Sequence, residues 1–441
     1  MTNNGIQPDA GITAITVQGF KSLYDETRVE IRPLTILAGA NSSGKSSTMQ
    51  PLLLLKQTLE APYDPGPLQL DGPILHFSAV EQFLSKTSTE ERAEAFKVSL
   101  ELHGARSLTD EFRRSAEHGL DLAEMRYHNG AQGFVLRSGM SREAAALAIP
   151  PSLRGIFGGR EAEGWHWEVD RFRCFFGLRI IADGQEAYDH LVRITRPFEE
   201  VVLKLVHVPA LPRSAQRSFP IAAIGSQLPG AFEHYVGSLV NDWQAKGDAR
   251  QQLLCAALEK LGLTGQIQAR QIDATQVEVL IGRLPKRGRS SNHDFVNIAD
   301  AGSGVRQILP VLVALLVAEP GQMVYLEEPE QNLHPRAEWL LAEVLADAAN
   351  RGVQVVVETH SSLLLFGVEA LVAEGKLGPQ LVKLHWFSRD KNGATKVTLG
   401  ELDGAGTFGE WPEDFGDVEM EAQGRFLDAS GAVQWKQAGA G

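Results

Sequence analysis

The stretch GANSSGKS, Gly39 to Ser46, follows the apolar run of VEIRPLTILAG and leads into GKSSTMQPLLLLKQTLE, which has a helical pattern. The stretch has the pattern G-x-x-x-x-G-K-S and lies between a predicted strand and a predicted helix. This pattern in this position is that of a phosphate-binding loop. Glycines let successive N–H groups point at phosphates, and the helix N-terminus adds positive potential. Lys45 supplies a compact cation and Ser46 a hydroxyl that can ligate Mg²⁺. The stretch therefore predicts a nucleotide site at a strand-to-helix turn; Pro51 requires that helix to bend or restart.

The composition is that of an ordinary soluble protein. The chain has 441 residues, 43% apolar and 22% charged, which suits one large domain with an insertion, or two domains. A net charge of −13 argues against coating nucleic acid by bulk electrostatics, so contact with DNA is possible but not implied. The basic stretch Gly282 to Arg289 is either a solvated hairpin tip or a local nucleic-acid contact.

Two further features bear on location. Cys174 and Cys255 lie too far apart for a metal-ligand spacing and suit a reduced setting. No segment has the roughly 20 consecutive apolar residues of a membrane span, and the N-terminus lacks the pattern of a signal peptide. We therefore expect a cytoplasmic protein without a membrane partner.

The patterns along the chain predict four parts. Residues 1–106 form an N-terminal lobe with the phosphate loop, residues 107–198 an inserted α/β lobe, residues 199–400 a C-terminal lobe, and residues 401–441 an acidic tail. In the C-terminal lobe, helix and strand patterns alternate, which predicts a mainly parallel sheet flanked by helices. QIQARQIDATQVEVLIGRLP, residues 266–285, predicts paired strands.

The stretch VYLEEPEQNLHP, Val324 to Pro335, places two carboxylates at the end of an apolar strand pattern. Nucleotide hydrolysis needs one carboxylate for the metal shell and another to orient or deprotonate water. We assign the first role to Glu327 and the second to Glu328. The alternative is an acidic cap between a strand and a loop.

Two weaker signals flank this stretch. DAGSGVRQILP, Asp300 to Pro310, places small residues before a helix whose N-terminus is a potential anion site. Lys45 already serves the chain's own nucleotide, so this second site suggests a nucleotide held by another subunit. VVVETHSS, Val355 to Ser362, ends a buried strand with His360, either a γ-phosphate sensor or a structural histidine.

These motifs occur in an order that resembles the ATP-binding-cassette (ABC) ATPase head of SMC-like and RecF-like proteins. ITVQGFKSL, LEEPEQNLHPRAE and VETHSSLLL narrow the resemblance to stand-alone bacterial AAA family ATPases, relatives of the ATPase half of OLD nucleases. The resemblance implies an α/β fold: an ABC-type head with a mixed, mainly parallel sheet, an antiparallel β-subdomain and an inserted lobe. It also implies ATP and Mg²⁺ as cofactors and a homodimer or higher oligomer that closes head to tail around ATP.

The resemblance assigns roles to individual residues. Glu328 and His360 are the catalytic pair, and Ser46, Glu327 and Gln82 serve the metal. The nucleotide contacts are Gly39, Ala40, Asn41, Ser42, Ser43, Gly44, Lys45, Ser46 and Ser47 from one subunit, with Ser303, Gly304, Arg306 and Asn332 from the other. Either Ser303 or Arg306 touches the opposite γ-phosphate, because the usual phenylalanine and serine of the relatives are absent at these positions.

The resemblance also implies a partner. Such ATPases switch an effector, a nuclease or similar protein encoded nearby, in phage defence or DNA maintenance. One alternative is an OLD-like nuclease. The acidic residues Asp403, Glu410, Glu413 and Asp414 could be mistaken for its metal ligands, although the tail after His360 is too short for that whole domain. The other alternative is the nucleotide-binding subunit of a transporter.

Overall fold

The computed structural model describes residues 11–86, 92–117, 119–130, 132–148, 165–182, 194–210, 216–283, 294–409, 424–425 and 427. Its central sheet has the strand order β10-β15-β16-β3-β17-β18. The first five strands are parallel and β18 is antiparallel. The bounds are β10 Val206–Val208, β15 Met323–Glu327, β16 Gln354–Thr359, β3 Leu34–Gly39, β17 Val382–Arg389 and β18 Thr395–Gly400. The predicted mainly parallel sheet is confirmed.

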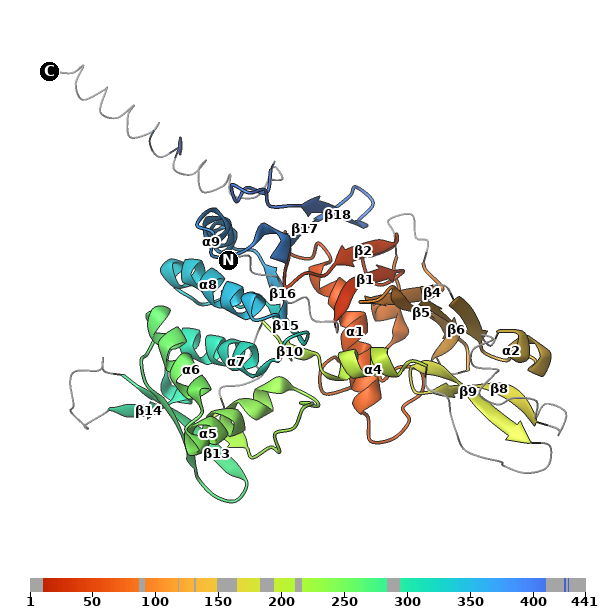
Figure 1. Ribbon diagram of the computed structural model, residues 1–441, viewed down its shortest axis with the longest axis horizontal. Coiled ribbons are helices and arrows are strands. Elements are labelled where there is room, and N and C mark those ends of the chain that lie inside the picture. The colour runs from red at the N-terminus through yellow and green to blue at the C-terminus, as the bar shows by residue number, and fades with distance from the viewer. Residues whose placement is uncertain are drawn as a thin grey trace, which may run out of the picture.

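Helices cover both faces of this sheet because its strands are apolar on both faces. Ile36 and Val357 enter one hydrophobic core, whereas their neighbours Leu37 and Val356 enter the other. α1 lies on one side and α5 to α9 on the other, as Figure 1 shows. The bounds are α1 Lys45–Glu60, α5 Val236–Lys246, α6 Ala249–Lys260, α7 Ser303–Val317, α8 Pro335–Asn350 and α9 Ser362–Ala373. α1 continues through Pro51 as one helix of 16 residues.

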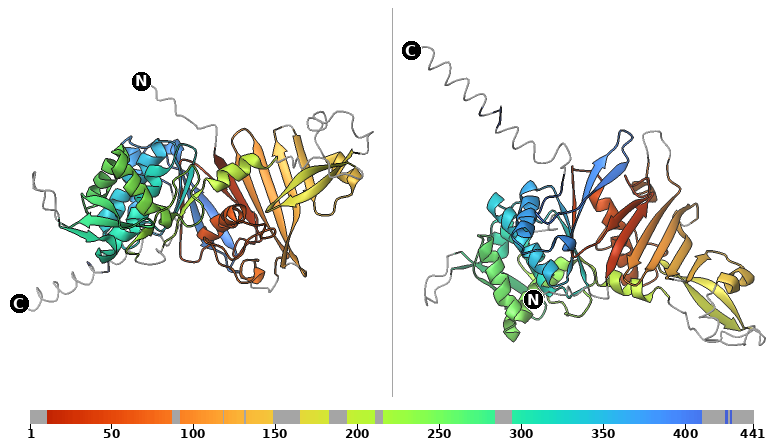
Figure 2. Two further views of the ribbon diagram at one scale, coloured as in Figure 1. Left: turned by 90° about the horizontal axis from the view of Figure 1, so that it is seen from below. Right: turned by 45° about the horizontal axis from the view of Figure 1, so that its top comes forward.

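A second sheet, entirely antiparallel, packs over α1 and extends away from the helical side of the molecule (Figure 2). Its order is β2-β1-β4-β5-β6-β7, with bounds β2 Thr27–Glu30, β1 Ile12–Gln18, β4 Ala95–Leu102, β5 Arg106–Ser115, β6 Gly119–Asn129 and β7 Gln132–Arg137. β5 begins at Arg106 and pairs with β4 along its length. The first strands of the predicted 107–198 insertion therefore continue the sheet that β1 and β4 begin.

The rest of that segment contains α2 (Arg142–Ala148) and the hairpin of β8 (Trp165–Phe172) and β9 (Phe175–Ala182), and its end at residue 198 lies inside α4 (Arg196–Leu203). The predicted strand pair in residues 266–285 is confirmed as β12 (Ile267–Gln271) and β13 (Gln276–Gly282), which pair antiparallel. β11 (Phe219–Pro220) and β14 (Phe295–Asn297) also pair with β13. Most of the basic stretch after Gly282 lies outside the described residues. Short 3₁₀ turns occupy η1 Val80–Gln82, η4 Phe232–Tyr235, η5 Ile298–Asp300 and η6 Pro379–Leu381.

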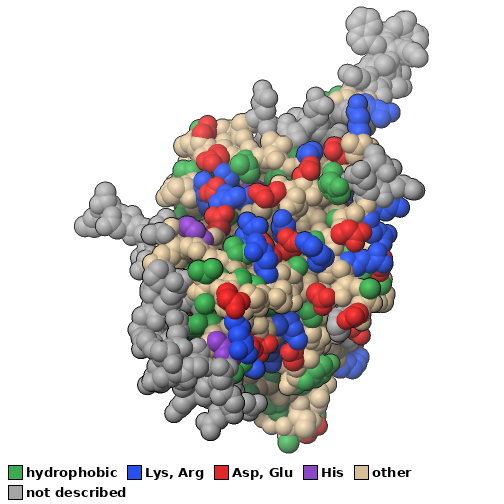
Figure 3. All heavy atoms as spheres, turned by 90° about the vertical axis from the view of Figure 1, so that its right-hand side faces the viewer, with side chains coloured by type: hydrophobic (Ala, Val, Ile, Leu, Met, Phe, Trp, Pro, Cys, Tyr) green, Lys and Arg blue, Asp and Glu red, His purple; other side chains and the backbone are tan. Residues whose placement is uncertain are grey.

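The described surface at the far end of the antiparallel sheet carries both signs of charge side by side (Figure 3). Strands β6 and β7 contain such pairs, with Glu124 between Arg126 and Arg137. Interspersed charges of this kind create no extended single-sign field of the sort that attracts a polyanion. Within the described residues, no helix is both long and apolar enough to cross a membrane.

Candidate nucleotide-binding site

The phosphate loop joins β3 to α1, and two of its glycines are required by their surroundings. Gly39 has φ +141°, and a Cβ there would lie 2.1 Å from the carbonyl oxygen of Phe387. Gly44 has φ +109°, and a Cβ there would lie 2.3 Å from Oγ1 of Thr395. Between them, residues 40–42 are exposed, so the crest of the loop is open to a ligand. The local sequence therefore builds the cradle that the motif predicts.

Strands β17 and β18 brace this loop from the side. Thr395 donates its hydroxyl hydrogen to the carbonyl oxygen of Ser43 at 2.7 Å, and Arg389 Nε donates to the carbonyl oxygen of Ser42 at 2.6 Å. These residues lie about 350 positions further along the chain. The sequence motif contains no signal for them, because the contacts depend on β17 pairing with β3.

Lys45 folds back onto its own loop. Its Nζ donates to the carbonyl oxygens of Gly39 and Ala40, both at 3.0 Å, and lies 3.1 Å from Nε2 of His360. Burial lowers the pKa of Lys45, and the charge of Glu358 opposes this effect. The ammonium group thus lies between the loop and the end of β16.

Glu328 lies against the same histidine. Its Oε1 is 2.8 Å from Nε2 of His360, and Gln331 Nε2 donates to its other carboxylate oxygen. The residue has φ +42°, a left-handed conformation that non-glycine residues rarely adopt. Its backbone N–H donates to the carbonyl oxygen of Glu358 at 2.9 Å, which helps to hold that conformation. The structure therefore brings Lys45, Glu328 and His360, from three separate motifs, to one point.

Ser46 contacts a carboxylate that the sequence prediction gave no role. Its Oγ donates to Oε2 of Glu358 at 2.7 Å, and Tyr325 donates its phenol hydrogen to the other oxygen of the same carboxyl. Glu358 is only 2% exposed. Its burial and then the charge of Glu327 raise its pKa to about 8. The one charged residue in the apolar run VQVVVET was the sequence signal that could have identified it.

Glu327, predicted for the metal shell, is held by the neighbouring strand β10. Its Oε1 lies 3.0 Å from Nε2 of His207, and its Oε2 accepts a hydrogen bond from the backbone N–H of Ala210 at 3.4 Å. Burial raises the pKa of Glu327, but the hydrogen bonds that its carboxylate accepts and the charge of His207 together outweigh burial, so the net shift is downward. Glu327 and Glu358 are register partners of β15 and β16, so two carboxylates lie side by side.

The N-terminus of α7 is free of capping side chains. Gly302 is the N-cap residue with no side-chain hydrogen bond, and both Gly302 and Ser303 are exposed. Gly304 packs near Asn332: a Cβ added at Gly304 would lie 3.1 Å from the carbonyl oxygen of Asn332. Arg306 is partly buried. The four residues predicted to reach an opposite nucleotide thus lie at or near this helix end.

Gln307, a residue without a predicted role, links this helix to the double carboxylate. Its Oε1 accepts a hydrogen bond from Nδ2 of Asn332 at 2.7 Å. Its Nε2 donates to the carbonyl oxygens of Ala210 at 2.8 Å and Glu328 at 3.4 Å. The buried amide thus joins α7, the end of β15 and the segment after β10.

Gln82, the predicted metal-shell glutamine, lies in η1 and is exposed. Its amide exchanges hydrogen bonds with the hydroxyl and backbone N–H of Ser78 at 2.8 and 2.9 Å. Asp403 accepts hydrogen bonds from Ala405 and Thr407 in a local turn. The other predicted nuclease ligands, residues 410, 413 and 414, lie outside the described residues.

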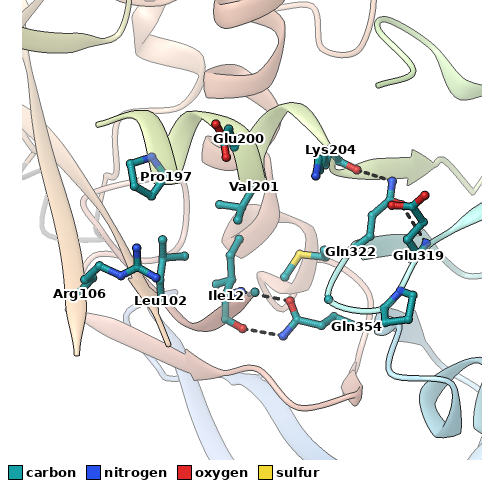
Figure 4. A pocket seen from close by; sticks show the side chains of 14 residues that line it. Ile12, Leu102, Arg106, Pro197, Glu200, Val201, Lys204, Glu319, Gln322 and Gln354 are labelled. Carbon is teal, nitrogen blue, oxygen red and sulfur yellow. Dashed lines mark hydrogen bonds between the residues drawn. The ribbon is translucent and has the colours of Figure 1, made fainter. Parts of the chain in front are cut away.

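A cavity of about 210 Å³ lies at the opposite, N-terminal ends of β15 and β16, away from the phosphate loop (Figure 4). Gln354 projects into it and bonds both backbone groups of Ile12, accepting at 3.1 Å and donating at 2.8 Å. Arg106, Glu200 and Lys204 also line it. The amide of Gln354 therefore ties the antiparallel sheet to the central sheet.

Comparisons with known proteins agree with this geometry over part of the chain. Residues 238–365 match the family described as "AAA domain, putative AbiEii toxin, Type IV TA system". This segment, less than a third of the chain, contains α7, both glutamates and His360. No match was found among curated proteins.

Solved structures of SMC heads are distantly similar. An SmcHead bound to the C-winged helix domain of ScpA has 12% identity and a TM-score of 0.49, over 90% of this chain and 99% of that one. The SMC head domain from Thermotoga maritima has 13% identity and a TM-score of 0.39, over 89% and 100%. An Smc head from Pyrococcus furiosus bound to the C-terminal domain of ScpA has 10% identity and a TM-score of 0.43, over 89% and 96%. Likenesses this distant assign no partner and no residue role.

The matched AAA segment and the phosphate loop lie on adjacent strands of one sheet, since β16 pairs directly with β3. The predicted α/β fold with a mainly parallel central sheet is confirmed. The AAA match agrees with the predicted resemblance to AAA family ATPases over residues 238–365.

Proposed function

We propose that the chain binds ATP at the phosphate loop and hydrolyses it. The observation that carries this proposal is the contact of both Lys45 and Glu328 with one imidazole nitrogen of His360. A cation for phosphate, a carboxylate for water and a hydrogen-bonding imidazole are the groups that phosphoryl transfer to water needs within one site.

Binding begins with an exchange of hydrogen bonds. The β- and γ-phosphate oxygens of ATP accept from the backbone N–H groups of residues 39–46, and Lys45 exchanges the carbonyls of Gly39 and Ala40 for phosphate oxygens. This exchange weakens the contact between Lys45 and His360. His360 then donates to the γ-phosphate, and Glu328 accepts a proton from the attacking water.

The residues around Ser46 suit Mg²⁺ as the cofactor. The Ser46 hydroxyl and the strand-end carboxylate that it contacts are hard oxygen donors, the type that Mg²⁺ prefers. When bound, the ion supplies charge neutralisation on the β- and γ-phosphates. Gln82 stays a prediction for this role, although its described partner is Ser78.

The exposed N-terminus of α7 supports a homodimer that closes head to tail. Its uncapped N–H groups and exposed Gly302 and Ser303 form a surface suited to an anion brought by a second subunit. Gln307 ties this helix end to the backbone of Glu328, so contact with the opposite nucleotide is transmitted to the hydrolytic carboxylate. We assign Ser303, at the exposed tip, the contact with the opposite γ-phosphate, and place Arg306 and Asn332 behind it.

Closure and reopening are the output of this cycle, read by a partner effector, a nuclease or similar protein. The matched family's description names a toxin of a Type IV TA system, which supports a setting in defence against phage or in DNA maintenance. The mixed charges in Figure 3 favour a protein partner over nucleic acid at that face.

Two variants test the dimer. Glu328→Gln keeps the shape of the side chain but removes the base, so it should accumulate an ATP-bound dimer, measured by light scattering on a sizing column. Adding Gly302→Asp should abolish the dimer, because a carboxylate at the N-cap repels the opposite γ-phosphate; a Cβ there meets nothing within 4 Å, so the fold is kept.

Gly302→Ala is the matched control, because it adds the Cβ without a charge or a capping oxygen and should leave the dimer intact. A Glu328→Gln protein that stays monomeric with saturating ATP and Mg²⁺ would contradict the proposed closure. A dimer that Gly302→Asp leaves unchanged would contradict the role of α7.

A further inference from the structure

Glu358 lies closer to the phosphate loop than Glu327 does, because of the order of the strands. β16 lies between β15 and β3, and Glu358 pairs directly with Leu37 of β3. Adjacent strands are spaced about 4.8 Å apart, so the backbone of Glu358 is one spacing from β3 and that of Glu327 is two, roughly 10 Å. The carboxylate nearest to the loop thus comes from the strand of His360.

The contacts of Ser46 agree with this order. A metal-shell carboxylate that serves the same cation as Ser46 must lie beside the Ser46 hydroxyl. That hydroxyl donates to Oε2 of Glu358 at 2.7 Å. The oxygens of Glu327 instead face His207 at 3.0 Å and the Ala210 N–H at 3.4 Å.

A purely structural role accounts poorly for Glu358. The other β16 positions between Gln354 and Thr359 are valines, and a further valine would pack in the same sheet without a desolvation cost. Instead a carboxyl is buried to 2% exposure, with Tyr325 fixing one oxygen and Ser46 the other. One of its oxygens thereby faces Ser46 at the start of α1, where the phosphate loop ends, and the other faces Tyr325 of β15.

We propose that Glu358, rather than Glu327, is the carboxylate that holds Mg²⁺ beside Ser46. Glu327, with His207, positions the end of β10 and the backbone of Ala210, to which Gln307 also bonds. This assignment rests on the proposed function, because it presumes that ATP and Mg²⁺ bind together at the loop.

The test compares Glu358→Gln with the matched variant Glu327→Gln, since both replace a strand-end glutamate by its amide. The affinity of each protein for a fluorescent, non-hydrolysable ATP analogue is measured with Mg²⁺ and with EDTA. The Mn²⁺ retained with the analogue is counted by electron paramagnetic resonance. Neither readout requires hydrolysis.

We expect Glu358→Gln to reduce the Mg²⁺-dependent gain in affinity and the retained Mn²⁺ by about tenfold or more. Glu327→Gln should keep both within about threefold of the unmodified chain, below the roughly 10–100-fold loss that follows when a side chain orienting a metal ligand is removed. Ser46→Ala should resemble Glu358→Gln, and the double variant should lose no more than either single one, because both act on one ion. Glu358→Asp, which keeps the charge, should recover part of the Mn²⁺.

The reverse ranking, with Mn²⁺ lost in Glu327→Gln and kept in Glu358→Gln, would overturn this assignment while leaving ATP binding in place. An unmodified chain that binds no nucleotide would instead refute the proposed function. If Glu358→Gln does not fold, Glu358→Asp and Ser46→Ala carry the comparison, and full Mn²⁺ binding by both would also overturn it.

Discussion

The burial of Glu358 predicts how the stability of the nucleotide-free chain varies with pH. Its pKa is raised from 4.5 to about 8, first by burial and then by the charge of Glu327. Between these values the folded chain keeps a proton that the unfolded chain has released. The free energy of unfolding therefore decreases as pH rises through this window, and Glu358→Gln removes this contribution.

The size of the effect follows from the two pKa values. The pH-dependent part of the gain in free energy of unfolding on Glu358→Gln should be about 4 kcal/mol near pH 8 and about 1 kcal/mol near pH 5. The substitution also changes the packing, which adds the same amount at both pH values. Urea unfolding in EDTA, followed by tryptophan fluorescence at both pH values, measures this difference. Trp243, 1% exposed in the helical core, reports on the loss of packing.

Glu101 provides the control, because its hydrogen bond with Arg28 lowers its pKa. A carboxyl group with a lowered pKa is ionised in both the folded and the unfolded chain across this pH window. Glu101→Gln should therefore change the free energy of unfolding by the same amount at both pH values. A raised pKa for Glu358 would be contradicted if Glu358→Gln also differed from the unmodified chain by the same free energy at both pH values, or if it gained more stability at low pH.

Three further outcomes are expected. Gly44→Ala should abolish binding of an ATP analogue, since the new Cβ would lie 2.3 Å from Oγ1 of Thr395. Gly66→Ala, also at positive φ but with nothing within 4 Å of the new Cβ, should bind the analogue normally. Equal binding by both variants would contradict the steric conflict at Gly44. Gln307→Leu removes the hydrogen bonds that link α7 to the end of β15. It should therefore slow ATP turnover, measured by phosphate release, about tenfold or more, while the affinity for an ATP analogue stays within about threefold. Burial raises the pKa of Cys174, so a thiol reagent should modify half-buried Cys255 first and Cys174 only after unfolding, as peptide mass mapping would show.

The phosphate loop was predictable from sequence because its chemistry depends on consecutive residues. The glycines, Lys45 and Ser46 lie within one turn between a strand and a helix, and short-range spacing specifies that turn. Glu328 and His360 were also recognisable, since each directly follows an apolar strand and parallel strands expose their carboxyl ends at one edge.

The contacts that the sequence did not reveal depend on which strands become neighbours. Ser46 meets Glu358 only because β16 pairs with β3, and Glu327 meets His207 only because β10 pairs with β15. Such pairings join residues more than 100 positions apart, and no local period encodes them. The first strands after residue 107 could not be assigned for the same reason, because their register on β4 is a tertiary property.

Glu328 is proposed to act on the water that attacks ATP, and phosphate release from purified protein measures this role. The unmodified chain with Mg²⁺ should release phosphate from ATP, and Glu328→Gln should reduce the rate by about 10²-fold or more while the affinity for ATP is kept. Lys45→Ala should lose binding as well as release. A Glu328→Gln protein that releases phosphate as fast as the unmodified chain would contradict the account.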